Sequence, residues 1–425
     1  MIGSLYAGIS GLNVNATAMS VIGDNIANVN TTAFKGNSVS FASVLSQSLT
    51  GSGGNSIGRG VQLGGMSRSW TQGTLENTGS GTDLAINGKG FFMVQNEAGL
   101  TCYTRSGGFN FNADGDLVNR DNMIVQGYSI DTVNADGTFT TGAIVDVSVT
   151  GATSPPSATD EMSTTVNLDA EATSTLPDTY ITAISVYDSL GNEIPLTITF
   201  TKNPTDRSWN VAASIPSTAG TSADITAGGV PLTSIEFDEA GKLASVTNTT
   251  PAVLTADPVI TLTLTNGATA SQAITWSLFD NNLSNGKVTG YAAQSATSFL
   301  SQDGYAAGAL QGISIDETGV VTGCFTNGEL PPLFQIALAD FPNYQGLNAV
   351  GDSLYSESRS SGQATPGTAG NGKFGLISSS ALEMSNVDLA NEFVKMITTQ
   401  RAFQASSRVI TTSDEILQDL INLKR

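Results

Sequence analysis

The stretch from Ser4 to Gly36, SLYAGISGLNVNATAMSVIGDNIANVNTTAFKG, joins an apolar stripe to a cluster of turn-forming residues. Starting at Ile2, just before this stretch, the stripe advances in steps of three and four and comprises Ile2, Leu5, Ile9, Leu12, Ala16, Met19, Ile22 and Ile26. Such spacing predicts a helix of roughly 25 residues that packs against another helix. The residues expected to end the helix by turn chemistry are Asn28, Asn30, Thr31 and Thr32.

Three glycines, Gly8, Gly11 and Gly23, lie inside this predicted helix. Each costs roughly 1 kcal/mol relative to alanine in a helix interior. We therefore expect the helix to depend on a partner, and the glycines to let that partner approach closely.

The C-terminal segment shows the same pattern. Ser385 and Asp388 resemble a capping box, and a helix of about 37 residues is expected to follow. Its stripe is Leu389, Phe393, Met396, Phe403, Ile410, Leu417 and Ile421. The two helices could form an ordinary hairpin within one monomer. We favour a terminal α-helical coiled coil inside a polymer, because two helices alone have no third layer to cover them.

Charge separates the ends from the middle. The chain has 425 residues and a net charge of -20, yet the first 35 residues contain only Asp24 and Lys35, and residues 373–425 are also balanced. The acidic excess therefore lies between them. Neutral ends suit close packing against other chains, whereas an acidic middle suits contact with water.

The sequence pattern in the middle of the chain predicts β structure. Six Asn/Asp-x-x-Gly blocks predict tight turns, at Asn96–Gly99, Asn112–Gly115, Asn134–Gly137, Asp188–Gly191, Asp238–Gly241 and Asp316–Gly319. Asp114 and Asp116 flank a glycine, as calcium-loop residues can, but the remaining ligands of an EF-hand are missing. We interpret this block as a plain turn.

Composition excludes several functions. Histidine is absent, which removes the usual general base and the commonest metal ligand. Cys102 and Cys324 are the two cysteines; free thiols are favoured over one bridge. We expect no cofactor, no catalytic or metal site, no nucleic-acid binding and no membrane insertion. The N-terminus lacks the features of a cleaved secretory signal.

These segments resemble the bacterial flagellar rod and hook family. The resemblance is carried by the stretch quoted above, by Thr71–Val94 (TQGTLENTGSGTDLAINGKGFFMV) and by the C-terminal segment that starts at Ser385. Its N-terminal motif includes Asn25, Asn28, Asn30, Thr31, Thr32, Phe34 and Lys35.

The resemblance implies a multidomain α+β chain. Residues 1–34 and 373–425 would form the terminal coiled coil, and residues 35–74 an extended linker arm. A discontinuous inner β domain would comprise 75–146 and 305–372, with an outer β domain, 147–304, inserted in it. Rod proteins of the family lack a large insert, so this layout favours a hook protein over a distal rod protein of the basal body.

The resemblance also implies a function. The chain would polymerise with itself into a curved, flexible tube that transmits torque from rod to filament as a universal joint. Its partners would be the distal rod, the hook cap, the hook–filament junction proteins and the flagellar type III export apparatus. Export would place it outside the cell without a cleaved signal peptide.

Two other classes of protein fit the sequence less well. A glycosidase would need a pair of carboxylates at a defined separation, and no spacing of acids in this sequence singles out such a pair. A β-repeat surface adhesin would explain the middle of the chain but not its two neutral, heptad-patterned ends. We therefore do not expect an enzyme.

Overall fold

The computed structural model describes residues 2–44, 47–48, 56–57, 59–133, 138–172, 178–203, 207–227, 230–248, 257–279 and 286–422. The chain forms two compact units. The first comprises residues 1–151, 312–323 and 330–425, and the second comprises residues 152–311 and 324–329. Each unit is described by itself below.

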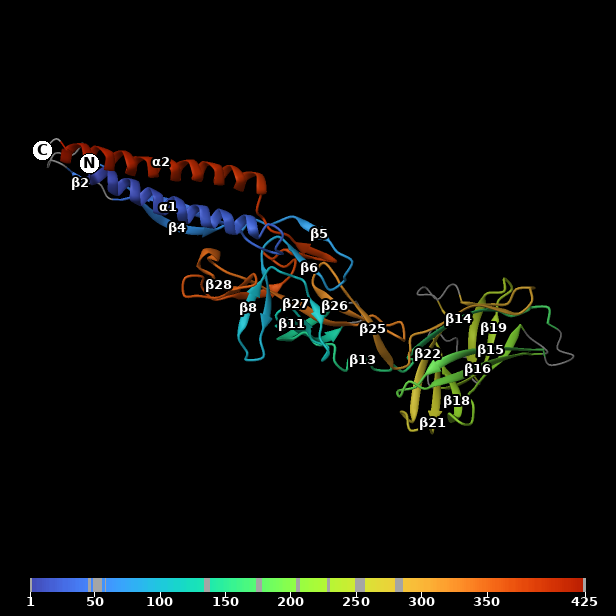
Figure 1. The fold of residues 1–425 in the computed structure, drawn as a ribbon. Helices are drawn as coiled ribbons and strands as arrows, with labels where there is room; N and C mark the ends of the chain where they lie inside the picture. Colours follow the sequence, from blue (N-terminus) through green and yellow to red (C-terminus); the bar gives the residue numbers. More distant parts are fainter. Residues whose placement is uncertain are drawn as a thin grey trace. The chain divides into compact units, whose positions relative to one another are not determined.

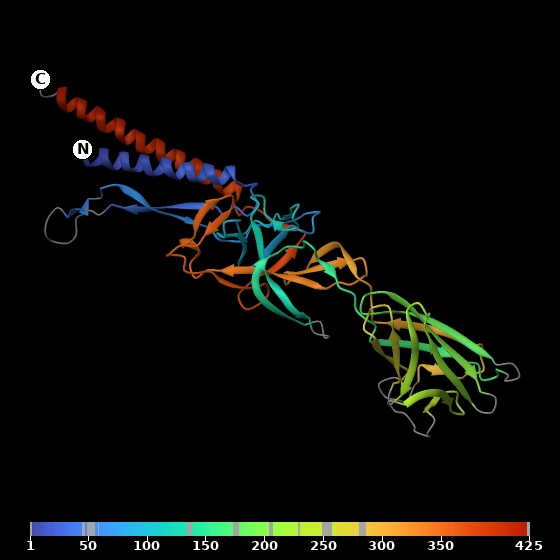
Figure 2. The same ribbon diagram turned by 90° about the horizontal axis from the view of Figure 1, so that it is seen from below.

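Two long helices of the first unit, α1 (Ile2–Ala27) and α2 (Leu389–Asn422), lie side by side and run in opposite directions (Figures 1 and 2). Near one end the hydroxyls of Ser4 and Ser413 are 3.3 Å apart. Near the other, the Asn25 side chain donates to Glu392 at 3.2 Å. Both predicted helices are therefore present.

The start of α2 differs in detail from the sequence expectation. Asp388 is the N-cap, because its carboxylate accepts from the backbone N–H of Ala390 at 2.8 Å. Ser385 instead accepts from the N–H of Val387 at 3.3 Å and lies before the cap. The helix consequently has 34 residues.

The expected linker arm contains an antiparallel ribbon. β1 (Asn37–Ser43) pairs with β4 (Val61–Arg68), from Asn37 opposite Arg68 to Ser43 opposite Val61, and β2 (Gln47–Ser48) pairs with β3 (Ser56–Ile57). The ribbon runs beside α1 (Figure 2), where the N–H of Val61 donates to Ser10 at 3.2 Å. It thus supplies part of the third layer that the helix pair was expected to lack.

The main sheet of the first unit contains the path β26–β27–β11–β7–β8–β29–β28. Its central strand β7 is buried on both faces: Phe92 and Val94 enter one apolar cluster, while Phe91 and Met93 enter another. Such a strand reads as a continuous apolar run, FFMV. The strands of the path are β26 (Val320–Phe325), β27 (Pro332–Asp340), β11 (Ile124–Val133), β7 (Phe91–Gln95), β8 (Thr101–Thr104), β29 (Leu354–Ser356) and β28 (Asn348–Gly351).

Shorter elements complete this unit. They are β5 (Leu75–Asn77), β6 (Leu84–Asn87), β9 (Asn110–Phe111), β10 (Leu117–Val118), β12 (Phe139–Asp146), the 3-10 helix η1 (Tyr344–Gly346), β30 (Thr365–Thr368), β31 (Leu376–Ser379) and β32 (Ala381–Glu383). Two of them, β31 and β32, pair with β6 and β5 and bring the chain back to the start of α2. β25 (Gly308–Ile315) and β26 include residues of both units.

The second unit is built on one large sheet whose strand order is β15–β16–β17–β19–β18–β21–β22–β14–β23. Its strands alternate buried and exposed side chains, as in β16 and β22, and the buried sides form one apolar core around Trp209 and Trp276. The strands are β13 (Thr153–Ser154), β14 (Glu161–Asn167), β15 (Thr179–Tyr187), β16 (Glu193–Lys202), β17 (Ser208–Ser214), β18 (Gly220–Ala227), β19 (Val230–Phe237), β20 (Leu243–Asn248), β21 (Val259–Leu264), β22 (Ser271–Ser277), β23 (Val288–Thr289) and β24 (Ala296–Gln302).

Five of the six predicted Asn/Asp-x-x-Gly turns are confirmed. Their glycines adopt left-handed backbone angles, with φ between 74° at Gly241 and 83° at Gly191. At Asp188 the carboxylate accepts from the N–H groups of Leu190 and Asn192, each at 2.9 Å. The sixth block, Asn134–Gly137, lies outside the described residues.

Candidate assembly site

The end of α1 is tied to both the ribbon and α2 through Asn25, which is buried. Its amide donates to the carbonyl of Asn37 at 2.8 Å, and its oxygen accepts from the N–H of Asn37 at 2.9 Å. It also contacts Glu392. Asn25 therefore fixes the point at which the first helix, the ribbon and the last helix meet.

The next motif residues close the helix as expected. The Asn28 amide donates to the carbonyl of Asp24 at 2.9 Å, and Thr31 donates to Asn28 at 3.1 Å. The hydroxyl of Thr32 lies 3.3 Å from that of Ser106 in the β region. Phe34 is half-buried, and Asn30 is exposed.

Lys35 ends the motif in a buried ion cluster. Its ammonium lies 2.6 Å from Glu383, and neither side chain is exposed (0% for each). Arg105 contacts the other carboxylate oxygen of Glu383 at 3.2 Å. The Lys35 ammonium also donates to the carbonyl of Thr71 at 2.8 Å, and the N–H of Gly73 donates to Glu383 at 2.9 Å.

This cluster locks together four chain segments, those around residues 35, 72, 105 and 383. Burial lowers the pKa of Lys35, although the Glu383 carboxylate acts in the opposite direction. Removing Glu383 would leave two buried cations without their carboxylate, which costs about 3–5 kcal/mol. The motif thus builds a stiff joint between the helices and the β region.

The predicted stripes lie along the helix pair but are only partly covered. Ile22 is buried, Ile9 is exposed, and the side chain of Ile421 lies outside the described part of α2. Leu389 and Phe393 are exposed. The half-buried stripe residues are Leu5, Leu12, Met19, Ile26, Met396, Phe403, Ile410 and Leu417.

Small residues make the closest helix contact. A Cβ added at Gly8 would lie 3.0 Å from Ile410, and one at Gly11 would lie 3.0 Å from Ser406. Gly23 has open space instead. Val14 and Ala18 are buried, and heptad counting missed both because they fall between the larger apolar residues.

Large apolar side chains remain exposed on this part of the molecule. On α2, Phe393 is 50% exposed, Val394 61% and Ile397 52%. On the ribbon, Phe41 is 53% exposed and Met66 62%. Exposed apolar side chains of this size are typical of a surface that binds a partner.

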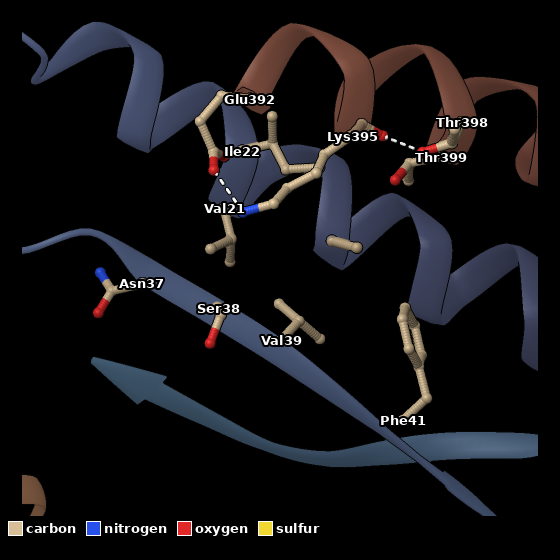
Figure 3. Close-up of a pocket in the computed structure, with 11 residues that line it drawn as sticks. Val21, Ile22, Asn37, Ser38, Val39, Phe41, Glu392, Lys395, Thr398 and Thr399 are labelled. Carbon is tan, nitrogen blue, oxygen red and sulfur yellow. Dashed lines mark hydrogen bonds and ion pairs between the residues drawn. The ribbon is translucent and has the colours of Figure 1, made fainter. Parts of the chain in front are cut away.

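A hollow of about 190 Å³ opens between α1, α2 and β1 (Figure 3). Val21 and Ile22 of α1 line it, together with Val39 and Phe41 of β1. At its rim the ammonium of Lys395 contacts Glu392 at 2.6 Å.

Two further features of the sequence are its cysteines and the turn at Asp116. Cys102 is buried and Cys324 is half-buried, and both are free thiols. The N–H of Asp116 donates to Asn112 at 2.8 Å, as in a plain turn. Among the residues that the structure describes, no cluster of His, Cys, Asp and Glu could hold a metal ion, and no helix is long and apolar enough to span a membrane.

The chain matches models of known protein families. Four family models match it: "Flagella basal body rod protein" at residues 5–35, "Flagellar hook protein FlgE/F/G D1 domain" at 85–174, "Flagellar basal body protein FlaE D2 domain" at 158–305 and "Flagellar basal body rod FlgEFG protein C-terminal" at 378–423. These matches define the class, that of the flagellar rod and hook proteins.

Full-length relatives narrow the class. The chain is 34% identical to the flagellar hook protein FlgE of Treponema pallidum, with all of both chains aligned. It is 35% identical to that of Salmonella typhimurium over 99% of this chain and 100% of the relative. A crystal structure of Helicobacter pylori hook protein FlgE2 aligns with a TM-score of 0.47 at 17% identity, covering 73% of this chain and 100% of that one.

The chain therefore belongs to the flagellar hook protein family. Its role is that of a structural subunit of the hook, and the distal-rod alternative has no better support. This family is structural and not enzymatic.

Proposed function

We propose that this chain polymerises with itself through its terminal helices into the curved, flexible tube of the flagellar hook. The observation that carries the proposal is the set of large apolar side chains that α2 and the ribbon leave exposed. Burying one large apolar side chain contributes about 1.5–3 kcal/mol. Several such residues per copy are enough to drive assembly, and their close packing would resist twist under torque.

In this proposal the parts of the chain divide the work. Residues 1–34 and 373–425 form the coiled-coil inner layer, and residues 35–74 fold back as a ribbon beside it. The inner β domain, 75–146 and 305–372, carries the inserted outer domain, 147–304. The ion cluster of Lys35, Glu383 and Arg105 supports this division, because it joins the helices rigidly to the inner domain.

The outer domain would provide a surface that slides as the tube bends. Exposed acids such as Glu171 and Glu193 favour hydration over tight contact. Replacing both with lysine should change the curvature of the tubes and leave assembly intact. Loss of assembly would assign this domain a different role.

A hook subunit lies between the rod and the filament, and this position implies further partners. We propose that the chain contacts the distal rod, the hook cap and the hook–filament junction proteins. It would reach the tip through the flagellar type III export apparatus without a cleaved signal peptide. A first helix weakened by Gly8, Gly11 and Gly23 suits passage in an unfolded state.

Electron microscopy of cells that lack this gene tests the proposal against its closest rival. A hook subunit predicts basal bodies with a complete rod and no hook. An incomplete rod would instead support a distal rod protein. Complementation with the full-length gene provides the control.

A further inference from the structure

The hollow between α1, α2 and β1 has an apolar floor and no unpaired charge among its lining residues. Val21, Ile22 and Val39 face it (Figure 3). Its two charged residues, Glu392 and Lys395, neutralise each other at 2.6 Å. The hollow is therefore suited to an apolar side chain and offers nothing specific to an anion or a cation.

The face of α2 that points away from the hollow carries exposed apolar side chains, called the projection below. Glu392, Lys395, Thr398 and Thr399 of α2 line the hollow. At 3.6 residues per turn, Phe393 and Ile397 then point away from it, with Val394 beside them. All three are at least half exposed, with values of 61% for Val394, 52% for Ile397 and 50% for Phe393.

We propose that the projection of Phe393, Val394 and Ile397 on one copy seats in the hollow of the next copy. This inference rests on the proposed self-assembly and names the surfaces that meet. Because the two surfaces lie on different faces of one chain, the contact is head-to-tail. Such a contact leaves a free projection at one end and a free hollow at the other, so it propagates into an open helical polymer.

Charge favours a second copy as the occupant. The chain as a whole carries -20, but residues 1–35 hold one acid and one base, and residues 373–425 are balanced. Two copies that approach through their acidic middles repel each other. The neutral terminal face, where both the projection and the hollow lie, is the surface through which they can approach without that repulsion.

Cysteine cross-linking in assembled tubes tests the contact. One full-length variant carries Val394→Cys and another Val39→Cys, which lines the hollow; both keep Cys102 and Cys324. Copolymers of the two, oxidised after assembly, should yield a disulfide-linked dimer on non-reducing gels. The matched control combines Val39→Cys with Val350→Cys, a residue of the first unit that is 58% exposed, and should yield none.

The outcomes separate the two proposals. Tubes without a 39–394 cross-link, or with an equal cross-link in the control, would overturn this contact and leave self-assembly standing. If the unaltered chain forms no tubes, the proposed function itself fails. As a second readout, Val394→Asp should raise the concentration needed for assembly at least tenfold, whereas Val350→Asp should not, and an equal effect of both would also overturn the contact.

Discussion

In the second unit Leu262, Ile274 and Trp276 are completely shielded from solvent (0% exposed), whereas Phe393, Val394 and Ile397 on α2 are at least half exposed. The second unit thus builds an apolar core within a single copy, although its Ile181, Leu190 and Phe299 are also more than half exposed. The helix pair leaves apolar surface open and meets the remainder through buried polar links at Asn25 and Lys35. We expect the second unit to be stable within one copy, and the helix pair to be completed by other copies.

The largest expected effect comes from removing the carboxylate of the buried ion cluster in the first unit. Glu383→Gln leaves the charges of Lys35 and Arg105 without their carboxylate, and should destabilise the first unit by about 3–5 kcal/mol. Chemical unfolding followed by circular dichroism and by tryptophan fluorescence measures the change. The control Glu239→Gln removes an exposed pair with Arg207 at 3.5 Å and should cost at most about 1 kcal/mol. Equal losses would mean that the buried cluster is not a joint.

A core substitution in the second unit should destabilise that unit without preventing assembly. Leu262→Ala removes a fully buried side chain from the core around Trp276, so that unit should lose about 2–5 kcal/mol of stability. Fluorescence of a Trp70→Phe background, which retains Trp209 and Trp276, reports its unfolding. Tubes should still assemble at a temperature where this unit remains folded. Loss of assembly under those conditions would make the two regions interdependent.

Acid should also act on the second unit through Asp188. Burial opposes ionisation of this carboxyl, but hydrogen bonds from Asn192, Asn266 and Leu190 outweigh it and lower its pKa below the usual 3.8. The unfolded chain therefore takes up the proton first as pH falls. The contribution is fully present above pH 3.8 and is lost as pH drops through the folded pKa.

Urea unfolding of the second unit at a series of pH values from about 5 downward measures this loss. Asp188→Asn should flatten the dependence of the unfolding free energy on pH in that range. An unchanged slope would show that Asp188 does not titrate differently in the folded and unfolded states.

The smallest expected effect distinguishes two helix glycines. Gly23→Ala meets open space and should stabilise α1 by roughly 1 kcal/mol. Gly8→Ala places a Cβ 3.0 Å from Ile410, so the gain should shrink or reverse. Thermal unfolding of the two variants side by side gives the comparison. An equal gain at both positions would mean that α2 does not pack closely at Gly8.

The features predicted from the sequence are those with local causes. The two helices and the turns, including Asp188–Gly191, depend on residues a few positions apart, and the structure confirms them. The contact of Lys35 with Glu383 joins residues 348 positions apart, and no local pattern encodes it. The ribbon was missed because its strands are rich in serine and glycine, and short, weakly apolar strands resemble a linker.

The candidate site was predicted in part. The family motif pointed to Asn25 and Lys35, but their roles as buried polar links depend on the tertiary fold. The expected close approach at Gly8 and Gly11 is present. Heptad counting named Ile9, which is exposed, and passed over Val14 and Ala18, which are buried. Side-chain size dominates a heptad count, while close approach between helices selects small residues.

The central claim is that the terminal helices, and not the acidic middle, drive polymerisation. Electron microscopy of the purified full-length chain and of a chain lacking residues 400–425 tests it most directly. The truncation removes the α2 residues that contact Gly8 and Gly11, and keeps Asp388 and Glu392. We expect tubes from the full chain, and from the truncated chain a soluble monomer with an intact β-sheet circular dichroism spectrum. Tubes from the truncated chain, or loss of its β-sheet signal, would contradict the account.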